Sequence, residues 1–250
     1  MSASDHFSGV AGAYALRRPR YPDELFAFLA AETTRHDLAW DCAAGTGQAT
    51  IPLSRHFRRV LATDQSAAML AQAPPHSSIE YRTAPANASG LGPSTADLVT
   101  VAQALHWIDP EPFYAEVHRV LRPGGMLAVW TYGNQRLEDP AVDPTLWRFY
   151  QEVVGPFWPP QRRHVEAGYR TLPFPYPELR TPDFHMEQRW TLDQLLGYIG
   201  TWSATQRFRE AKGYDPVAEL ARELQVSWGE PAASRRIVWP LSIRVGRRPG

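Results

Sequence analysis

The first 135 residues alternate short apolar runs with amphipathic segments, and this alternation constrains the fold more than any other feature. Short β-branched runs separated by helical patterns are typical of βαβ units around a parallel sheet. The predicted strands are 38–42, 60–64, 79–83, 97–102 and 126–131, and the predicted helices are 22–31, 48–56, 66–73 and 113–121. Ser66 is expected to cap its helix, and Pro123-Gly124-Gly125 predicts a turn before the fifth strand.

Residues 136–250 have a different composition. Nine of the 23 prolines lie between residues 140 and 182, where one amphipathic segment, 145–154, is embedded among many aromatic residues. So many aromatic side chains argue for an ordered insertion and against a solvated linker. A strand at 185–190, helices at 192–203 and 216–228, and a β-rich run at 236–245 are predicted to follow. The two strands are expected to extend one edge of the sheet, with antiparallel pairing.

Composition limits the partners. Lys+Arg and Asp+Glu both total 26, so the chain has no net charge to attract a nucleic-acid backbone or an anionic membrane. The single cysteine, Cys42, excludes an intrachain disulfide and favours the cytoplasm. No signal-peptide pattern or long apolar run predicts export or membrane spanning. All basic residues but Lys212 are arginines, which reflects either codon bias or arginines that bind carboxylates bidentately.

The segment 40–49, W-D-C-A-A-G-T-G-Q-A, joins the first strand to a helix through small residues. Such a loop lets a ligand approach the backbone, and the helix start offers free N–H groups. Thr50 stands where a dinucleotide fingerprint has its third glycine, which weakens a pyrophosphate interpretation. Asp41 would repel a phosphate and attract an ammonium group. The segment therefore predicts a cationic nucleoside ligand.

A second carboxylate, Asp64, closes the second predicted strand. A carboxylate at this point of a nucleotide-binding fold can accept two hydrogen bonds from a ribose diol. The alternative is that Asp64 only stabilises the helix that begins at Ser66.

These motifs resemble the class I S-adenosylmethionine-dependent methyltransferases with a type 11 domain. D-C-A-A-G-T-G (41–47) is similar to their first motif, D-x-G-x-G-x-G, with Ala43 at the first glycine. Alanine disfavours positive φ, so the loop must avoid that conformation or carry strain. Q-A-L-H-W (103–107), R-V-L-R-P-G-G (119–125) and Y-A-L-R-R-P-R-Y-P (14–22) resemble a small-molecule branch akin to the trans-aconitate methyltransferases.

The resemblance implies a Rossmann-like, doubly wound, seven-stranded, mostly parallel α/β sheet with an antiparallel edge strand. Residues 1–135 would form the cofactor-binding core with an N-terminal lid helix, and residues 136–250 a substrate lid plus the last strands and helices of the same domain. The cofactor would be S-adenosyl-L-methionine, and the methyl acceptor a small molecule, with a carboxylate oxygen as one candidate. No metal ligand spacing occurs among the eight histidines. A monomer or homodimer is expected.

The resemblance also implies site residues. The cofactor set is Tyr14, Arg18, Asp41, Ala43, Gly45, Gly47, Asp64, Gln65, Ala86, Asn87, Gln103, His106 and Trp107. Arg18 would pair with the cofactor carboxylate, Tyr14 would cover the cofactor, and Asn87 would contact the adenine. The substrate set is Trp147, Tyr150, Trp158, Arg163, Tyr169, Arg170 and Trp202, for most of which core packing is the alternative.

His106 is the candidate general base, because an imidazole can accept a proton near neutral pH. A hydroxyl or amine acceptor would need such a base, whereas a carboxylate would not. The alternative is that His106 only orients its loop. One of Arg162, Arg163 and Arg170 is a candidate to bind an acidic acceptor.

Two other functions remain open from the sequence. The alanine in the first motif would suit a non-catalytic cofactor-binding module, and the same sheet would suit a nicotinamide-dependent oxidoreductase. RNA is disfavoured as acceptor by the absence of a basic footprint.

Overall fold

The computed structural model describes residues 19–250, which contain a seven-stranded sheet in the order β3-β2-β1-β4-β5-β7-β6. The strands are β1 (Leu38–Cys42), β2 (Arg59–Asp64), β3 (Ile79–Thr83), β4 (Ala96–Ala102), β5 (Leu121–Tyr132), β6 (Phe184–Trp190) and β7 (Arg235–Arg247). The first five pair in parallel, and β7 is antiparallel to both β5 and β6. The predicted fold is confirmed, with one refinement: the strand of opposite direction lies one position in from the edge.

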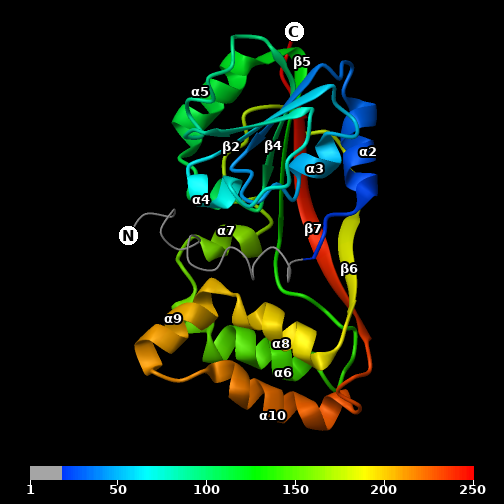
Figure 1. Cartoon of the computed structure of the whole chain (residues 1–250), viewed down its shortest axis with the longest axis vertical. Coiled ribbons are helices and arrows are strands. Elements are labelled where there is room, and N and C mark those ends of the chain that lie inside the picture. Colours follow the sequence, from blue (N-terminus) through cyan, green and yellow to red (C-terminus); the bar gives the residue numbers. More distant parts are fainter. Residues whose placement is uncertain (1–18) are drawn as a thin grey trace.

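Helices cover both faces of the parallel part (Figure 1). They are α2 (Asp23–Glu32), α3 (Thr50–Leu53), α4 (Ala67–Leu70) and α5 (Pro110–Val120). Successive side chains of a strand point to opposite faces. Leu98 accordingly packs in one core with Leu25 of α2, while its neighbour Val99 packs in the other with Phe113 of α5. Burial on both faces explains the nearly continuous apolar strands of the sequence.

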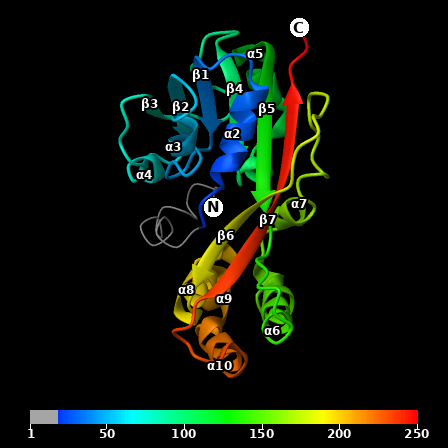
Figure 2. The same cartoon turned by 90° about the vertical axis from the view of Figure 1, so that its right-hand side faces the viewer.

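The C-terminal half contributes helices α6 (Asp143–Arg148), α7 (Arg162–Glu166), α8 (Leu192–Gly200), α9 (Ser203–Lys212) and α10 (Pro216–Trp228). Figure 2 shows α6, α8, α9 and α10 gathered beyond one end of the sheet, joined to it by the long strands β6 and β7. α7 lies closer to the sheet, where it contacts β5. Within the described residues, no helix is long and apolar enough to cross a membrane.

Some predicted boundaries were wrong. The helix expected at 192–203 is two helices separated at Thr201 and Trp202, and α9 was not predicted. The segment 145–154 forms α6 and a π-helical turn, Phe149–Val153. β5 begins at Leu121 because this residue pairs with Ala96 of β4, so the expected Pro-Gly-Gly turn lies inside an irregular start of the strand.

Candidate cofactor and acceptor site

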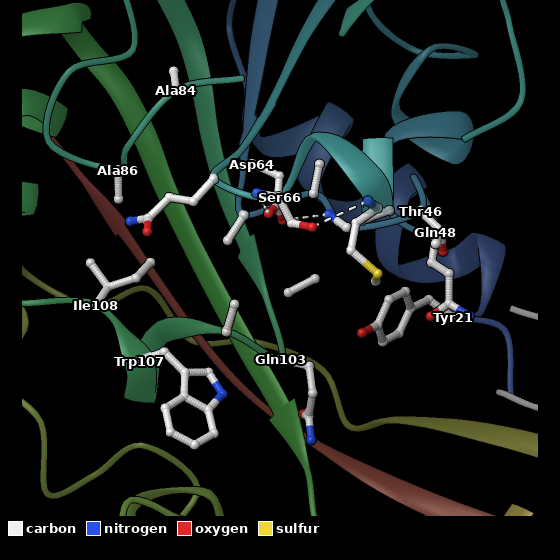
Figure 3. A pocket seen from close by; sticks show the side chains of 18 of the residues that line it. Tyr21, Thr46, Gln48, Asp64, Ser66, Ala84, Ala86, Gln103, Trp107 and Ile108 are labelled. Atoms are coloured by element: carbon white, nitrogen blue, oxygen red, sulfur yellow. Dashed lines mark hydrogen bonds between the residues drawn. The ribbon is translucent and has the colours of Figure 1, made fainter. Parts of the chain in front are cut away.

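A pocket opens at the carboxyl ends of the parallel strands, the usual ligand site of an open α/β sheet (Figure 3). Its walls come from the loops after β1, β2, β3 and β4, with Tyr21 and Tyr132 on the side of β5. Seven residues of the predicted cofactor set line it: Ala43, Gly45, Asp64, Gln65, Ala86, Gln103 and Trp107.

The loop after β1 carries backbone strain at the position that distinguishes this sequence. Ala43 has φ 56°, in the left-handed region that disfavours residues with a Cβ. Gly45 has φ 57°, and a Cβ added there would lie 3.5 Å from Met69 Cε, a neighbour in the pocket wall. Of the two possibilities that the sequence left open, the loop therefore tolerates strain rather than avoiding positive φ.

Asp64 is the last residue of β2 and lines the pocket beside this loop (Figure 3). Its Oδ2 accepts a hydrogen bond from Gly45 N at 2.9 Å, and its Oδ1 accepts one from Ser66 N at 2.8 Å. The two backbone donors fix the orientation of the carboxylate, and each oxygen keeps a second lone pair for a ligand. Ser66 also caps α4, as predicted, by accepting from Met69 N.

Asp41 does not line the pocket, and the structure corrects its predicted role. The side chain is fully buried, and its oxygens accept hydrogen bonds from Thr50 Oγ1 at 2.5 Å and Thr100 Oγ1 at 2.8 Å. Burial raises the pKa of this carboxyl to about 6, against the opposing effect of the two hydroxyls. Asp41 therefore joins α3 to β4 beneath the loop and does not face an ammonium group.

Gln103 lines the pocket on the side of β5. Its Oε1 accepts hydrogen bonds from Thr131 Oγ1 and Tyr132 N, and its Nε2 donates to the Tyr132 carbonyl at 3.0 Å. These contacts hold the ends of β4 and β5 at a fixed separation, and Gln103 itself adopts a positive φ of 55°. The amide thus shapes the pocket wall through the strands it joins.

The chain is similar to known methyltransferases in both sequence and structure. A family model described as a methyltransferase domain matches residues 40–129, which contain the pocket loops. An uncharacterized methyltransferase of Mycobacterium tuberculosis is 37% identical over 202 residues, covering 79% of this chain and 76% of that protein. A candidate methyltransferase of Dictyostelium discoideum is 29% identical over 88% of this chain and 85% of its own.

A solved structure of a candidate type II methyltransferase from Anaeromyxobacter dehalogenans has a TM-score of 0.88 and 46% identity, covering 93% of this chain and 99% of that one. The chain belongs to the class I S-adenosylmethionine-dependent methyltransferases. Similarity to the trans-aconitate branch in particular stays a prediction. Family membership also favours a methyltransferase over the two alternatives that the sequence left open, a non-catalytic cofactor-binding module and an oxidoreductase.

Two further members of the predicted cofactor set do not line the pocket of this methyltransferase, although their chain neighbours do. Gly47 is buried and Asn87 is exposed, and neither is among the residues that line it. Tyr14 and Arg18 lie outside the described residues. The sequence reasoning missed Tyr21, although it is part of the Y-P motif, as well as Met69, Tyr132 and the small residues Ala84, Ala102 and Ala104.

His106 lies just outside the pocket, in the 3₁₀ turn Leu105–Trp107. Its Nδ1 is 2.9 Å from the hydroxyl of Tyr169, a side chain fully buried in the core. Burial, reinforced by the charges of Arg162 and His164, lowers the pKa of His106 to about 3. Burial raises the pKa of Tyr169 far above its usual range. At neutral pH both groups are uncharged, and His106 is a much weaker base than predicted.

Four of the predicted substrate residues form one aromatic cluster, consisting of Trp147, Tyr150, Trp158 and Trp202. The ring centroids of Tyr150 lie 5.2 Å from Trp158 and 5.7 Å from Trp202, and Trp147 stacks on Tyr150 at 5.7 Å. Trp147 stays half exposed. Tyr169 belongs to the other core, where its hydroxyl lies 2.9 Å from His106 Nδ1.

The two arginines of the predicted substrate set do not join this cluster. Arg163 is exposed, and its side chain contacts His164, with Nε 3.5 Å from His164 Nε2. Arg170 forms an exposed ion pair with Glu178 at 2.8 Å. Arg162, one residue before Arg163, instead lies over the rings of Trp158 and Tyr150. Because α7 turns its consecutive residues to different sides, only one of the neighbours can face the cluster.

Two amides beyond β5 were also missed. Gln135 is buried, and both its side-chain atoms, Oε1 and Nε2, lack hydrogen-bond partners; the same is true of Asn134 Oδ1. An unpaired buried amide is costly, so such groups call for an explanation in terms of strain or function. No cluster of metal-ligating side chains occurs in the described part of the chain.

Proposed function

We propose that this methyltransferase transfers a methyl group to a small molecule that lies between the cofactor pocket and the aromatic cluster, and that the acceptor atom is a carboxylate oxygen. The observation that carries the cofactor assignment is Asp64, a carboxylate that lines the pocket at the carboxyl end of β2 and is held by two backbone N–H groups. A carboxylate acceptor is favoured because His106 Nδ1 already lies 2.9 Å from the Tyr169 hydroxyl and burial lowers the pKa of this imidazole.

The pocket suits S-adenosylmethionine by its chemistry. Asp64 would accept hydrogen bonds from the ribose hydroxyls. Ala84, Ala86 and Ile108 offer a narrow apolar wall for the adenine, and Trp107 lies farther along the same wall (Figure 3). When bound, the cofactor supplies an electrophilic methyl group on a sulfonium.

The acceptor is expected to arrive already ionised. With a pKa of about 3, His106 cannot efficiently take a proton from a hydroxyl or an ammonium group at neutral pH. A carboxylate needs no such base. The remaining task of the protein is to align the acceptor oxygen with the methyl group and to exclude water, which positioned, partly closed sites do well. Tyr150, Trp158 and Trp202 would close the acceptor side.

The cofactor assignment is tested by calorimetric titration of the full chain with S-adenosylhomocysteine. Replacing Asp64 by asparagine should weaken binding about tenfold or more, because hydrogen bonds to a charged oxygen are the stronger ones. The control is Asp183→Asn, a change to an exposed residue outside the pocket, which should leave binding unchanged. Absence of binding to the unaltered chain would contradict the proposal.

The acceptor atom is tested with cofactor labelled in its methyl group and a panel of carboxylic acids, phenols and amines. Methyl esters release volatile labelled methanol in mild alkali, whereas methyl ethers and methylamines do not. Alkali-labile label is expected. Label found only in stable products would refute the carboxylate and point to a base other than His106.

A further inference from the structure

Arg162 occupies a position unlike that of the neighbouring arginines. It begins α7, which packs against the 3₁₀ turn that carries His106. Its guanidinium carbon lies 4.4 Å from the ring centroid of Trp158 and 5.4 Å from that of Tyr150. Its Nε donates to the Tyr150 hydroxyl at 2.8 Å, which in turn donates to Glu166 Oε1 at 2.7 Å. The guanidinium is therefore held in orientation by stacking and by one of its five N–H groups.

Its other donors have no acceptor within the described residues. No ion pair there includes Arg162, and neither terminal nitrogen has a hydrogen bond. Trp158, over whose ring the guanidinium lies, adds another unpaired donor, because its Nε1 is buried without a partner. Arg148 and Arg170, in the same half of the chain, both pair with glutamates. Unpaired donors around one fixed cation are what an anion-binding site provides before its ligand arrives.

No carboxylate of the described residues is bonded directly to this cation. His106 and Tyr169 are both uncharged at neutral pH and lie close enough for Arg162 to lower their pKa values. His164 adds no opposite charge, and Glu166 reaches Arg162 only through the Tyr150 hydroxyl. A cationic ligand would be repelled here, and a neutral one would leave the charge unpaired.

We infer that Arg162, with Trp158 beside it, binds an anionic group of the methyl acceptor and so selects acidic small molecules. This inference rests on the proposed function, since it assigns the substrate class of the same site. A carboxylate fits best because its two oxygens match the two terminal nitrogens of a guanidinium. The aromatic rings of the cluster would pack against the apolar part of such an acid.

The test uses the full chain saturated with S-adenosylhomocysteine, titrated with benzoate and with glutarate, and with the matching neutral amides. Calorimetry gives the affinities, and a change in tryptophan fluorescence that is lost in a Trp158→Phe variant reports binding beside Trp158. At least one acid should bind about tenfold or more tightly than its amide. Arg162→Gln should abolish this preference for acids. Arg162→Lys should retain part of it, because lysine keeps the positive charge but lacks the paired N–H groups that bind a carboxylate at two points.

The matched control is Arg163→Gln, which changes an exposed neighbour on the same short helix and should leave the preference intact. Unchanged affinity for S-adenosylhomocysteine shows that each variant is folded. Equal binding of acids and amides, no acid binding, or an Arg162→Gln variant that still prefers acids would overturn the inference. Failure of the unaltered chain to bind S-adenosylhomocysteine would instead contradict the proposed function.

Discussion

The buried carboxyl of Asp41 makes a prediction about stability that can be worked from the structure. Its pKa is raised from 3.8 to about 6 on folding, chiefly by burial. The folded state therefore holds this proton more tightly than the unfolded chain does. Stability from this group is fully present below pH 3.8 and is lost as pH rises toward 6. A difference of about two in pKa corresponds to about 3 kcal/mol of unfolding free energy.

The perturbation is Asp41→Asn, which removes the titration and keeps a side chain of the same shape. At pH 4 the folded carboxyl is protonated and, like asparagine, presents one acceptor oxygen and one donor to the hydroxyls of Thr50 and Thr100, so the two proteins should have similar stability at that pH. Relative to the variant, the free energy of unfolding of the unaltered chain should fall by about 2 kcal/mol between pH 4 and pH 7. Other carboxylates titrate in both proteins and cancel in the difference.

The assay is urea denaturation of both proteins at half-unit pH steps from 4 to 8, followed by circular dichroism. A free-energy difference that stays constant across this range would refute the reasoning and show that Asp41 is ionised throughout. Cofactor affinity, measured in parallel, should change little with Asp41 because the side chain does not line the pocket.

Two further predictions concern strain and unpaired groups. Ala43→Gly should raise the free energy of unfolding by about 0.5–1 kcal/mol, because glycine adopts φ 56° without steric cost. The control Ala44→Gly relieves no positive φ and should lower the free energy of unfolding. Equal effects of the two changes in thermal denaturation would argue against strain at Ala43. Gln135→Leu should stabilise the fold by about 1 kcal/mol or more, because it removes two unpaired buried atoms. The same change at the exposed Gln151 should stay within about 0.5 kcal/mol, and a destabilised Gln135→Leu variant would indicate that the amide has partners.

The strands of the sheet could be predicted from the sequence because the spacing of apolar residues follows which side chains are buried. The strands 38–42 and 79–83 were placed at their observed bounds, since turn residues flank both. The boundaries of the helices in the C-terminal half were harder to predict. α9 has few apolar residues, and its separation from α8 depends on Trp202, which is buried in the aromatic cluster; a single pattern across 192–203 does not reveal that break.

The sequence predicts a site residue correctly when its position at the end of a strand is enough to place it in the pocket. It does not when the role of the residue depends on partners that are distant in the sequence. Asp64 and Gln103 follow strands and line the pocket, as the order of elements indicates. Asp41 also ends a strand, but its partners Thr50 and Thr100 lie on two separate elements, and nothing local distinguishes a buried acceptor from a ligand contact. The choice among Arg162, Arg163 and Arg170 likewise depends on how α7 is rotated, which the sequence does not fix.

The position of β7 has a consequence for how the chain assembles during synthesis. β7 follows every other described strand in the chain, yet it lies between β5 and β6 in the sheet. The first five strands can pair as they leave the ribosome, but β6 has no neighbour until β7 has emerged. Until then the outer side of β5 is an open edge, which other chains could pair with. The edge closes only when β7 pairs with β5, and the same event gives β6 its neighbour.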